Sequence, residues 1–187
     1  MSDGDRPVVA VVDDQERIVE AFAYWLESDY EVRRATGGEE ALDAVDEAVD
    51  VVLLDRHMPG TSGDEVLDEL RERGLDCRVA MVTAVDPELG IADLPFDAYV
   101  TKPVDEAELR ETVEELLRVA SLADHSRELF AVSEKIAALE AEHNPAALAD
   151  AEEYQRLLDR RADLQAEGAE TKLSADDAEA AFRDLDP

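Results

Sequence analysis

The chain has 187 residues, 45% of them hydrophobic, which is enough to bury the core of one domain of about 100 to 150 residues and to add a further segment. No apolar run approaches the roughly 20 residues needed to span a bilayer, and the first residues lack the basic and apolar regions of a signal peptide. We therefore expect a globular, cytoplasmic protein with no membrane partner.

The net charge of -31 is the extreme feature of the composition, because 49 acidic residues face 18 basic ones. Such a surface repels itself strongly unless the ionic strength is high, and halophilic proteins use large net charge in this way. We therefore expect the source to have a salt-rich cytoplasm. The single cysteine, Cys77, cannot form an internal disulfide, which fits a reducing compartment.

The first part of the chain alternates strand-like and helix-like patterns. Residues 7–12 form a near-continuous apolar run that predicts a buried strand, and it ends at the acidic pair Asp13-Asp14. An alternating segment at residues 30–32 predicts a half-exposed edge strand. The intervening helix is indicated by apolar residues at helical spacing, namely Ile18, Phe22, Trp25 and Leu26.

The same alternation continues through the middle of the chain. A capping-box pattern at residues 36–39 predicts the start of a second helix, and a buried strand at residues 51–54 then ends at Asp55. Residues 62–65 form a second capping box, which predicts a helix that Gly74 can end.

Two further strands complete the pattern. Residues 79–82 predict a buried strand ending at Thr83, and residues 98–100 predict one followed by Lys102. Between them, Asp86-Pro87 is typical of a helix cap followed by a first-turn proline, although the helix to about residue 92 is weakly patterned. A helix capped at Asp105 follows the last strand.

Five strands alternating with helices predict an α/β fold with a parallel sheet. The polar second strand belongs at an edge, so we predict a flavodoxin-like, doubly wound, five-stranded sheet of order 2-1-3-4-5. Ligand sites of such sheets lie outside the carboxyl ends of the strands. The side chains brought to that edge are those that follow or end the four apolar strands: Asp13, Asp14, Asp55, Thr83 and Lys102.

These residue types together indicate phosphoryl transfer. Clustered carboxylates repel one another and call for a cation, and hard oxygen ligands suit Mg²⁺. An aspartate can also act as a nucleophile and form an aspartyl phosphate. Lys102 would supply a fixed positive charge and Thr83 a hydroxyl donor to the phosphoryl oxygens.

The motifs Asp13-Asp14, Asp55 before Met-Pro-Gly, Thr83-Ala84 and Tyr99-Val-Thr-Lys-Pro resemble the receiver domain of two-component response regulators. The resemblance covers residues 7–119, preceded by a tail of residues 1–6 that we expect to be disordered. It implies a phosphoacceptor rather than an enzyme in its own right, with only self-catalysed phosphoryl transfer and autodephosphorylation. The implied partner is a sensor histidine kinase.

The resemblance also implies a role for each site residue. Asp55 would be the phosphoacceptor, assisted by Lys102 and Thr83, and Thr83 and Tyr99 would form the switch pair. The implied Mg²⁺ ligands are Asp14 and Asp55 directly, Asp13 through water, and the backbone carbonyl of His57. The Lys102-Pro103 bond would be cis. We expect the His57 side chain to face solvent.

From about residue 121 the composition changes to an Ala- and Glu-rich, helical pattern. Asn144-Pro145 is typical of a cap and first-turn proline, so two apolar stripes on either side of it predict an antiparallel helical hairpin. Gly168 could end its second helix, and a short last helix could follow, with disordered final residues. His125 is expected to be an ordinary helix residue.

Residues 120–187 resemble the HalX domain found after receivers in halophilic archaea, in placement, size and acidic character. Apolar stripes of this kind can close within the hairpin, pack on the receiver or pair with a second chain. We favour a regulatory role through a protein partner or a homodimer, switched by phosphorylation. The alternatives are a DNA-binding transcriptional regulator and a degenerate receiver used as a scaffold. DNA binding is not favoured, since residues 121–187 carry a net charge of -10.

Overall fold

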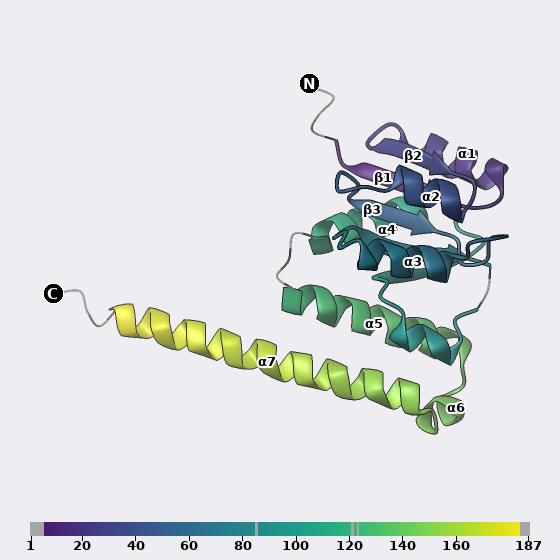
Figure 1. Cartoon of the computed structure of the whole chain (residues 1–187). Coiled ribbons are helices and arrows are strands. Elements are labelled where there is room, and N and C mark those ends of the chain that lie inside the picture. Colours follow the sequence, from purple (N-terminus) through teal and green to yellow (C-terminus); the bar gives the residue numbers. More distant parts are fainter. Residues whose placement is uncertain (1–5, 85, 121, 123, 184–187) are drawn as a thin grey trace.

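The computed structural model describes residues 6–84, 86–120, 122 and 124–183 (Figure 1). Its sheet is parallel throughout and has the order β2-β1-β3-β4-β5, which confirms the predicted flavodoxin-like fold. The strands are β1 (Val8–Val12), β2 (Glu31–Ala35), β3 (Val51–Leu54), β4 (Arg78–Thr83) and β5 (Ala98–Thr101).

Helices cover both faces of the sheet. One face packs against α1 (Glu16–Leu26) and α4 (Glu106–Ala120), and the other against α2 (Gly38–Ala44) and α3 (Gly63–Glu72). The inner strands β1, β3 and β4 are apolar on both sides for this reason, whereas β2 carries charged residues at the edge. A parallel sheet with helices on both faces is the doubly wound arrangement that the sequence predicts.

The two predicted capping boxes have different outcomes. Ser62 caps α3 as expected, since its side chain accepts from the backbone N–H of Glu65 and the Glu65 carboxylate bonds back to Ser62. The capping box at residues 36–39 is wrong. Gly37, which has no side chain to accept a bond, is the cap of α2, and the N–H and hydroxyl of Thr36 donate instead to the carboxylate of Glu40.

The crossover from β4 to β5 differs from the prediction. Its described residues hold a five-residue 3₁₀ helix, η1 (Leu89–Asp93), whose cap is Glu88 rather than Asp86. Parallel crossovers usually carry an α-helix that covers the sheet. Here the sheet face beside η1 needs another cover.

That cover comes from the C-terminal helices α5 (Asp124–Glu142), α6 (Pro145–Ala149) and α7 (Glu152–Arg183), here called the helical hairpin. Figure 1 shows α5 and α7 running antiparallel, with α6 at the turn between them. Asn144 caps α6 as predicted, its side chain accepting from the Ala147 N–H at 2.9 Å.

The predicted end of the hairpin at Gly168 is wrong, because α7 continues through this residue to Arg183. His125 of α5 packs closely against this position, so that a Cβ at Gly168 would lie 3.1 Å from His125 Nε2. The chain after Asn144 also forms two helices, α6 and α7, where the sequence pattern favours one.

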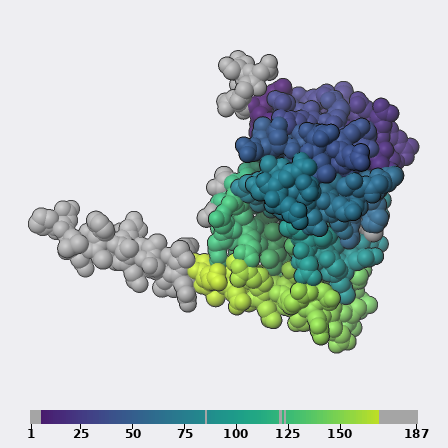
Figure 2. Space-filling model, in the orientation of Figure 1, coloured from purple at the N-terminus to yellow at the C-terminus, as the bar shows by residue number. Residues whose placement is uncertain are grey.

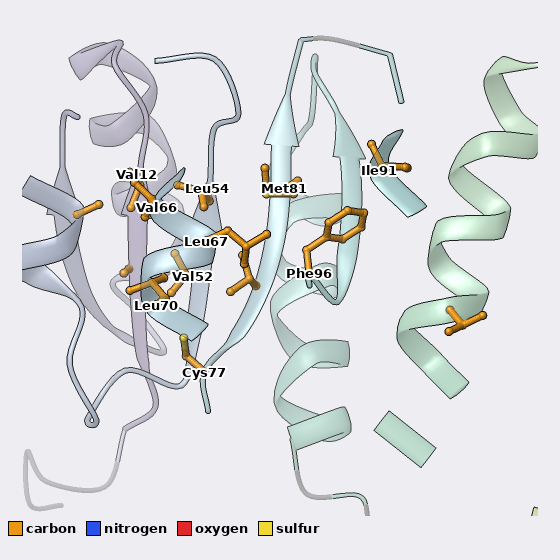
Figure 3. Packing of buried hydrophobic residues seen from close by; sticks show 14 of the residues in the cluster. Val12, Val52, Leu54, Val66, Leu67, Leu70, Cys77, Met81, Ile91 and Phe96 are labelled. Atoms are coloured by element: carbon orange, nitrogen blue, oxygen red, sulfur yellow. The ribbon is translucent and has the colours of Figure 1, made fainter. Parts of the chain in front are cut away.

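The helical hairpin and the α/β domain of residues 6–120 share one hydrophobic core. Val132 and Ile136 of α5 and Leu157 of α7 belong to the same buried cluster as Ile91 and Phe96. Figure 3 shows Ile91 and Phe96 at the end of this core that faces the C-terminal helices. Since α5 also contacts the edge strand β5, the hairpin completes the sheet on the side where η1 leaves it open.

Some predictions fall on residues outside those described. Residues 1–5 and 184–187 lie outside them, as does Ser121, near which the composition changes and the helix is expected either to break or to turn a new face outward. Arg6 is described, and its guanidinium donates to the Glu27 carbonyl at 3.2 Å. Among the described helices, none combines the length and apolar character that crossing a bilayer requires.

Candidate functional site

Four strands deliver polar side chains to one edge of the sheet. β1 and β3 end directly before Asp13 and Asp55, and the Asp55 N–H donates to the Val12 carbonyl at 2.8 Å. β4 ends at Thr83, whose carbonyl accepts from the N–H of Lys102 at 2.8 Å. The backbone ladder therefore fixes the relative positions of these residues before any side chain interacts.

Lys102 joins the two buried aspartates. Its Nζ lies 2.9 Å from Asp55 Oδ1 and also donates to Asp13 Oδ2. Asp13 and Asp55 are only 2% and 6% exposed, so both carboxylates depend on this ammonium for charge compensation. The structure thus brings together three residues that are distant in sequence and were predicted to meet.

The pKa directions follow from burial and charge. Burial raises the pKa of Asp55, the bonds from Lys102 act against that rise, and the charges of Asp13 and Asp14 add to it. Burial opposes charge on Lys102, yet its hydrogen bonds to Asp13 and Asp55 raise its pKa overall. Lys102 is therefore held as a cation between two carboxylates that partly repel each other.

Backbone N–H groups orient both carboxylates. The N–H of Gln15 donates to Asp13 Oδ1 at 2.9 Å, and the N–H of His57 donates to Asp55 Oδ2 at 3.2 Å. The His57 side chain is exposed, as expected. Each carboxylate is thus held by one backbone donor and by Lys102, which leaves its remaining lone pairs for a ligand.

The donor set fits a hard cation. Mg²⁺ prefers one or two carboxylates together with waters and phosphate oxygens, and Asp13 and Asp55 supply two at one edge of the sheet. Asp14 is exposed beside them, close enough for its charge to raise the pKa of Asp55. Among the described residues, no group of three or more His, Cys, Asp or Glu side chains is already arranged around a metal position.

The expected switch residues occupy neighbouring strands. Thr83 is buried at the end of β4, level with Thr101, while Tyr99 lies two residues earlier on β5, opposite Met81. The Tyr99 ring is half-buried, with its centroid 5.8 Å from that of Phe96. Burial raises the pKa of the Tyr99 phenol, and a hydrogen bond with Arg56 acts against the rise.

The sequence did not indicate that two residues near Asp55, Arg56 and Gly63, contribute to the structure of the site. Arg56 forms a bidentate pair with Asp64, with Nε–Oδ1 and Nη2–Oδ2 distances of 3.0 Å each. Gly63 approaches the segment around Asp55 so closely that a Cβ would lie 2.2 Å from the Asp55 carbonyl oxygen. The capping box around Gly63 marks the helix start but gives no sign of this approach.

The environments of Cys77 and His125 do not indicate a catalytic role. Cys77 is buried, and burial raises the pKa of its thiol, which disfavours the reactive thiolate. His125 lies between α5 and α7, with Nδ1 3.4 Å from Glu167 Oε2. The Lys102-Pro103 peptide is cis, as expected.

Comparison with known families identifies this arrangement. Residues 9–114 match the model of the response regulator receiver domain. The chain belongs to the response regulator receiver family. Residues 118–186 of this response regulator match the HalX domain, which confirms the second resemblance. Its receiver homology places it among two-component response regulators.

Individual relatives agree with this assignment. A Haloferax volcanii protein named "Putative transcriptional regulator" is 48% identical over 174 residues, which are 92% of this chain and 29% of that protein. The alkaline phosphatase synthesis transcriptional regulatory protein PhoP of Bacillus subtilis is 39% identical over 127 residues, 65% of this chain and 52% of PhoP. The response regulator thus spans about a third to half the length of these relatives.

A solved structure of a response regulator also matches part of this chain. Response regulator protein TrrA of Thermotoga maritima, determined in complex with Mg(2+)-BeF, is 37% identical. The match has a TM-score of 0.52 and covers 59% of this response regulator and 99% of TrrA.

Proposed function

We propose that this response regulator accepts a phosphoryl group on Asp55 from a sensor histidine kinase. The observation that carries the proposal is the Lys102 ammonium, 2.9 Å from Asp55 Oδ1 and bonded to Asp13 as well. A nucleophilic carboxylate, a second buried carboxylate and a fixed cation are the groups that phosphoryl transfer to aspartate requires.

The chemistry follows from these positions. An Asp55 carboxylate oxygen attacks the phosphorus of the kinase phosphohistidine, an O–P bond forms, and the P–N bond breaks with its electron pair going to the imidazole. Lys102 holds Asp55 in its ionised form before transfer and faces the added negative charge afterwards. Thr83, buried at the end of β4, offers its hydroxyl to a phosphoryl oxygen.

Mg²⁺ fits this site as a cofactor and would neutralise charge on the phosphoryl oxygens when bound. Asp13, Asp14 and Asp55 would hold it, together with the backbone carbonyl of His57. The buried aspartates carry one more negative charge than Lys102 offsets, which supports cation binding at this edge.

We further propose that phosphorylation changes protein contacts through the helical hairpin. The Tyr99 ring contacts the Phe96 ring in a tilted arrangement, with their centroids 5.8 Å apart, and the same Phe96 ring lies 5.1 Å from Lys135 Nζ of α5. A rearrangement of Thr83 and Tyr99 would therefore act on a residue that also packs against the hairpin. This contiguous packing supports a route from the site to α5.

DNA binding is the less favoured output. Two arginines of α7 are already paired with acidic side chains, since Arg156 lies 3.0 Å from Asp93 and Arg160 lies 2.7 Å from Glu128. A phosphate-binding surface needs basic groups free to release counterions. A mobility shift on promoter DNA that weakens with salt would favour the DNA-binding alternative.

Phosphorylation is tested with acetyl phosphate and Mg²⁺ in concentrated KCl, followed by intact mass spectrometry. Wild type should gain one phosphoryl group, and Asp55→Asn none. Asp68→Asn, an exposed carboxylate on α3, is the matched control and should be modified as wild type is. Unmodified wild type, or equal modification of Asp55→Asn, would contradict the proposal and favour a scaffold role.

Switching needs its own measurement. Hydrogen exchange of the full chain is compared with and without beryllofluoride and Mg²⁺. Amides of α5 and η1 should change protection in wild type and stay unchanged in Asp55→Asn. Changes confined to the loops around Asp55 would contradict transmission to the hairpin.

A further inference from the structure

A cavity of about 490 Å³ lies between the receiver and the helical hairpin. Its walls include Arg78, the first residue of β4, and Asp97, directly before β5, so it lies at the amino edge of the sheet. Asp55 is at the opposite, carboxyl edge. Figure 2 shows the hollow between the teal receiver and the green and yellow helices.

The charge around this cavity is unusual for the protein. The chain has 18 basic residues in all, yet five of them line this one cavity: Arg71, Arg78, Arg127, Lys135 and Arg160. Four acidic residues also line it: Asp76, Asp97, Asp124 and Glu128. The lining therefore carries one net positive charge in a chain whose net charge is -31.

Lys135 is the source of this surplus. It is 8% exposed, and its Nζ donates one hydrogen bond, to the Ala92 carbonyl at 3.3 Å, and lies over the Phe96 ring. Among the described residues it forms no ion pair with a carboxylate. Burial lowers the pKa of Lys135, as expected for an ammonium without a partner.

A second donor in the cavity is also unused. The Nε of Arg78 is buried and has no hydrogen-bond partner among the described atoms, although its other nitrogens bond to Asp97 and Asp76. Arg78 is 8% exposed. Buried donors are nearly always paired, so two incompletely satisfied cationic side chains that line one cavity indicate a missing acceptor.

The other basic groups are already compensated. Arg71 bonds to Asp97 and to the Cys77 carbonyl, and Arg160 forms a bidentate pair with Glu128. Arg127 pairs with Asp124 and Asp76. A ligand carrying one negative charge would balance the lining, whereas a dianion would add a charge that the four acidic residues oppose.

The cavity also has apolar walls, formed by Leu75, Pro95, Val132 and Leu157 among others. We propose that it binds a small organic monocarboxylate, with the carboxylate accepting from Lys135 and Arg78 and the apolar body against these walls. A volume of about 490 Å³ is within the range of small-molecule sites. Because both the receiver and the hairpin line the cavity, such a ligand stabilises their docked arrangement. This site does not depend on phosphorylation of Asp55.

The test uses the full-length protein at constant ionic strength. Titration calorimetry and thermal unfolding are measured with potassium benzoate and potassium propionate, and with chloride and inorganic phosphate as competing anion classes. We expect a saturable rise in unfolding temperature with a carboxylate, and a loss of affinity of about tenfold or more in Lys135→Met. Without ligand, Lys135→Met should unfold at a higher temperature than wild type, because a buried unpaired charge is gone.

Arg156→Met is the matched control, since Arg156 also links α7 to η1 through Asp93 but does not line the cavity. It should bind carboxylates as wild type does. If Lys135→Met does not fold, Ala131→Phe fills the cavity from α5 and should abolish binding while keeping Lys135. No saturable effect of either carboxylate, equal binding by Lys135→Met or Ala131→Phe, or tighter binding of phosphate or chloride than of carboxylate would overturn the proposal.

Discussion

Asp97 Oδ1 accepts a hydrogen bond from Arg78 Nη1 at 3.0 Å, and both side chains are at least nine-tenths buried. Asp97 Oδ2 also accepts from the Val79 N–H at 2.8 Å. One carboxylate thus joins the start of β4 to the residue before β5. Removing its charge leaves a buried guanidinium without its main partner.

Asp97→Asn should therefore lower the free energy of unfolding by about 3 kcal/mol, measured by urea denaturation. Asp93→Asn is the control, because Asp93 pairs with Arg156 on the exposed surface and its loss should hardly move the unfolding midpoint. Equal effects of the two substitutions would show that burial of the Asp97 pair does not matter.

Asp55→Asn should stabilise the unphosphorylated protein at neutral pH. Burial raises the pKa of Asp55 in the folded state above its ordinary value of 3.8, so the folded state binds this proton more tightly than the unfolded state does. Stability linked to Asp55 is then present below pH 3.8 and is lost as the pH rises through the raised pKa. Asparagine does not ionise, so the variant does not lose this stability as the pH rises. The unfolding temperature of Asp55→Asn should therefore exceed that of wild type by a few degrees at pH 7.

The difference between Asp55→Asn and wild type should shrink as the pH is lowered toward 3.8. Thermal unfolding of both proteins across this range measures it. Asp68→Asn provides the baseline for an exposed carboxylate. A stabilisation that grows toward acid pH would contradict the raised pKa.

Gly63→Ala should destabilise the fold by about 3 kcal/mol, since its Cβ would meet two backbone atoms, the Asp55 carbonyl oxygen at 2.2 Å and the Arg56 Cα at 2.8 Å. Neither backbone atom can yield without moving Asp55, the proposed phosphoacceptor, so phosphorylation should slow as well. Gly90→Ala in η1 is the matched control, because nothing lies within 4 Å of its added Cβ. Urea unfolding and acetyl phosphate labelling measure both effects, and wild-type behaviour of Gly63→Ala would refute the steric argument.

The fragment of residues 1–120 should be less stable than the whole chain. It lacks the helices that cover Ile91, Phe96 and the edge of β5. We expect a lower unfolding temperature and increased binding of the dye ANS to the exposed apolar surface. The fragment 1–168 keeps Leu164 of α7 and should unfold as the whole chain does. A fragment 1–120 as stable as the whole would mean that the hairpin adds nothing to the receiver core.

Stability should rise with salt because of the net charge of -31. Going from about 0.1 M to about 1 M KCl shortens the screening length from about 10 Å to about 3 Å, which weakens repulsion among surface carboxylates. The unfolding temperature should increase in KCl and NaCl alike. Unchanged stability, or a response to only one of the two salts, would argue against screening as the cause.

Much of the receiver could be predicted because its pattern is local. Apolar runs that stop at a polar residue identify both the buried strands and the ends that carry Asp13, Asp55 and Thr83, and a parallel sheet then brings those ends together. The meeting of Lys102 with both aspartates follows from topology alone. The roles of these residues stay predictions.

The packing of the helical hairpin could not be predicted in the same way. Helical spacing shows which face of α5 is apolar but not what that face packs against. Lys135 is a charged residue next to Glu134 and Ser133, so the sequence gives no sign that its side chain is buried. Gly168 reads as a helix end unless the approach of His125 is known. The close contact of Gly63 with Asp55 likewise arises from two segments meeting in space.

The short crossover η1 has a consequence for how such proteins can evolve. Signalling receivers are often pictured as modules that recombination can attach to any output. In this protein, Ile91 and Phe96 are buried within a core to which the helical hairpin contributes. A gene fusion that exchanged the hairpin for an unrelated domain would give a stable protein only if the new domain supplied an apolar helix to cover Ile91 and Phe96. Receiver and hairpin are therefore a pair that selection should keep together.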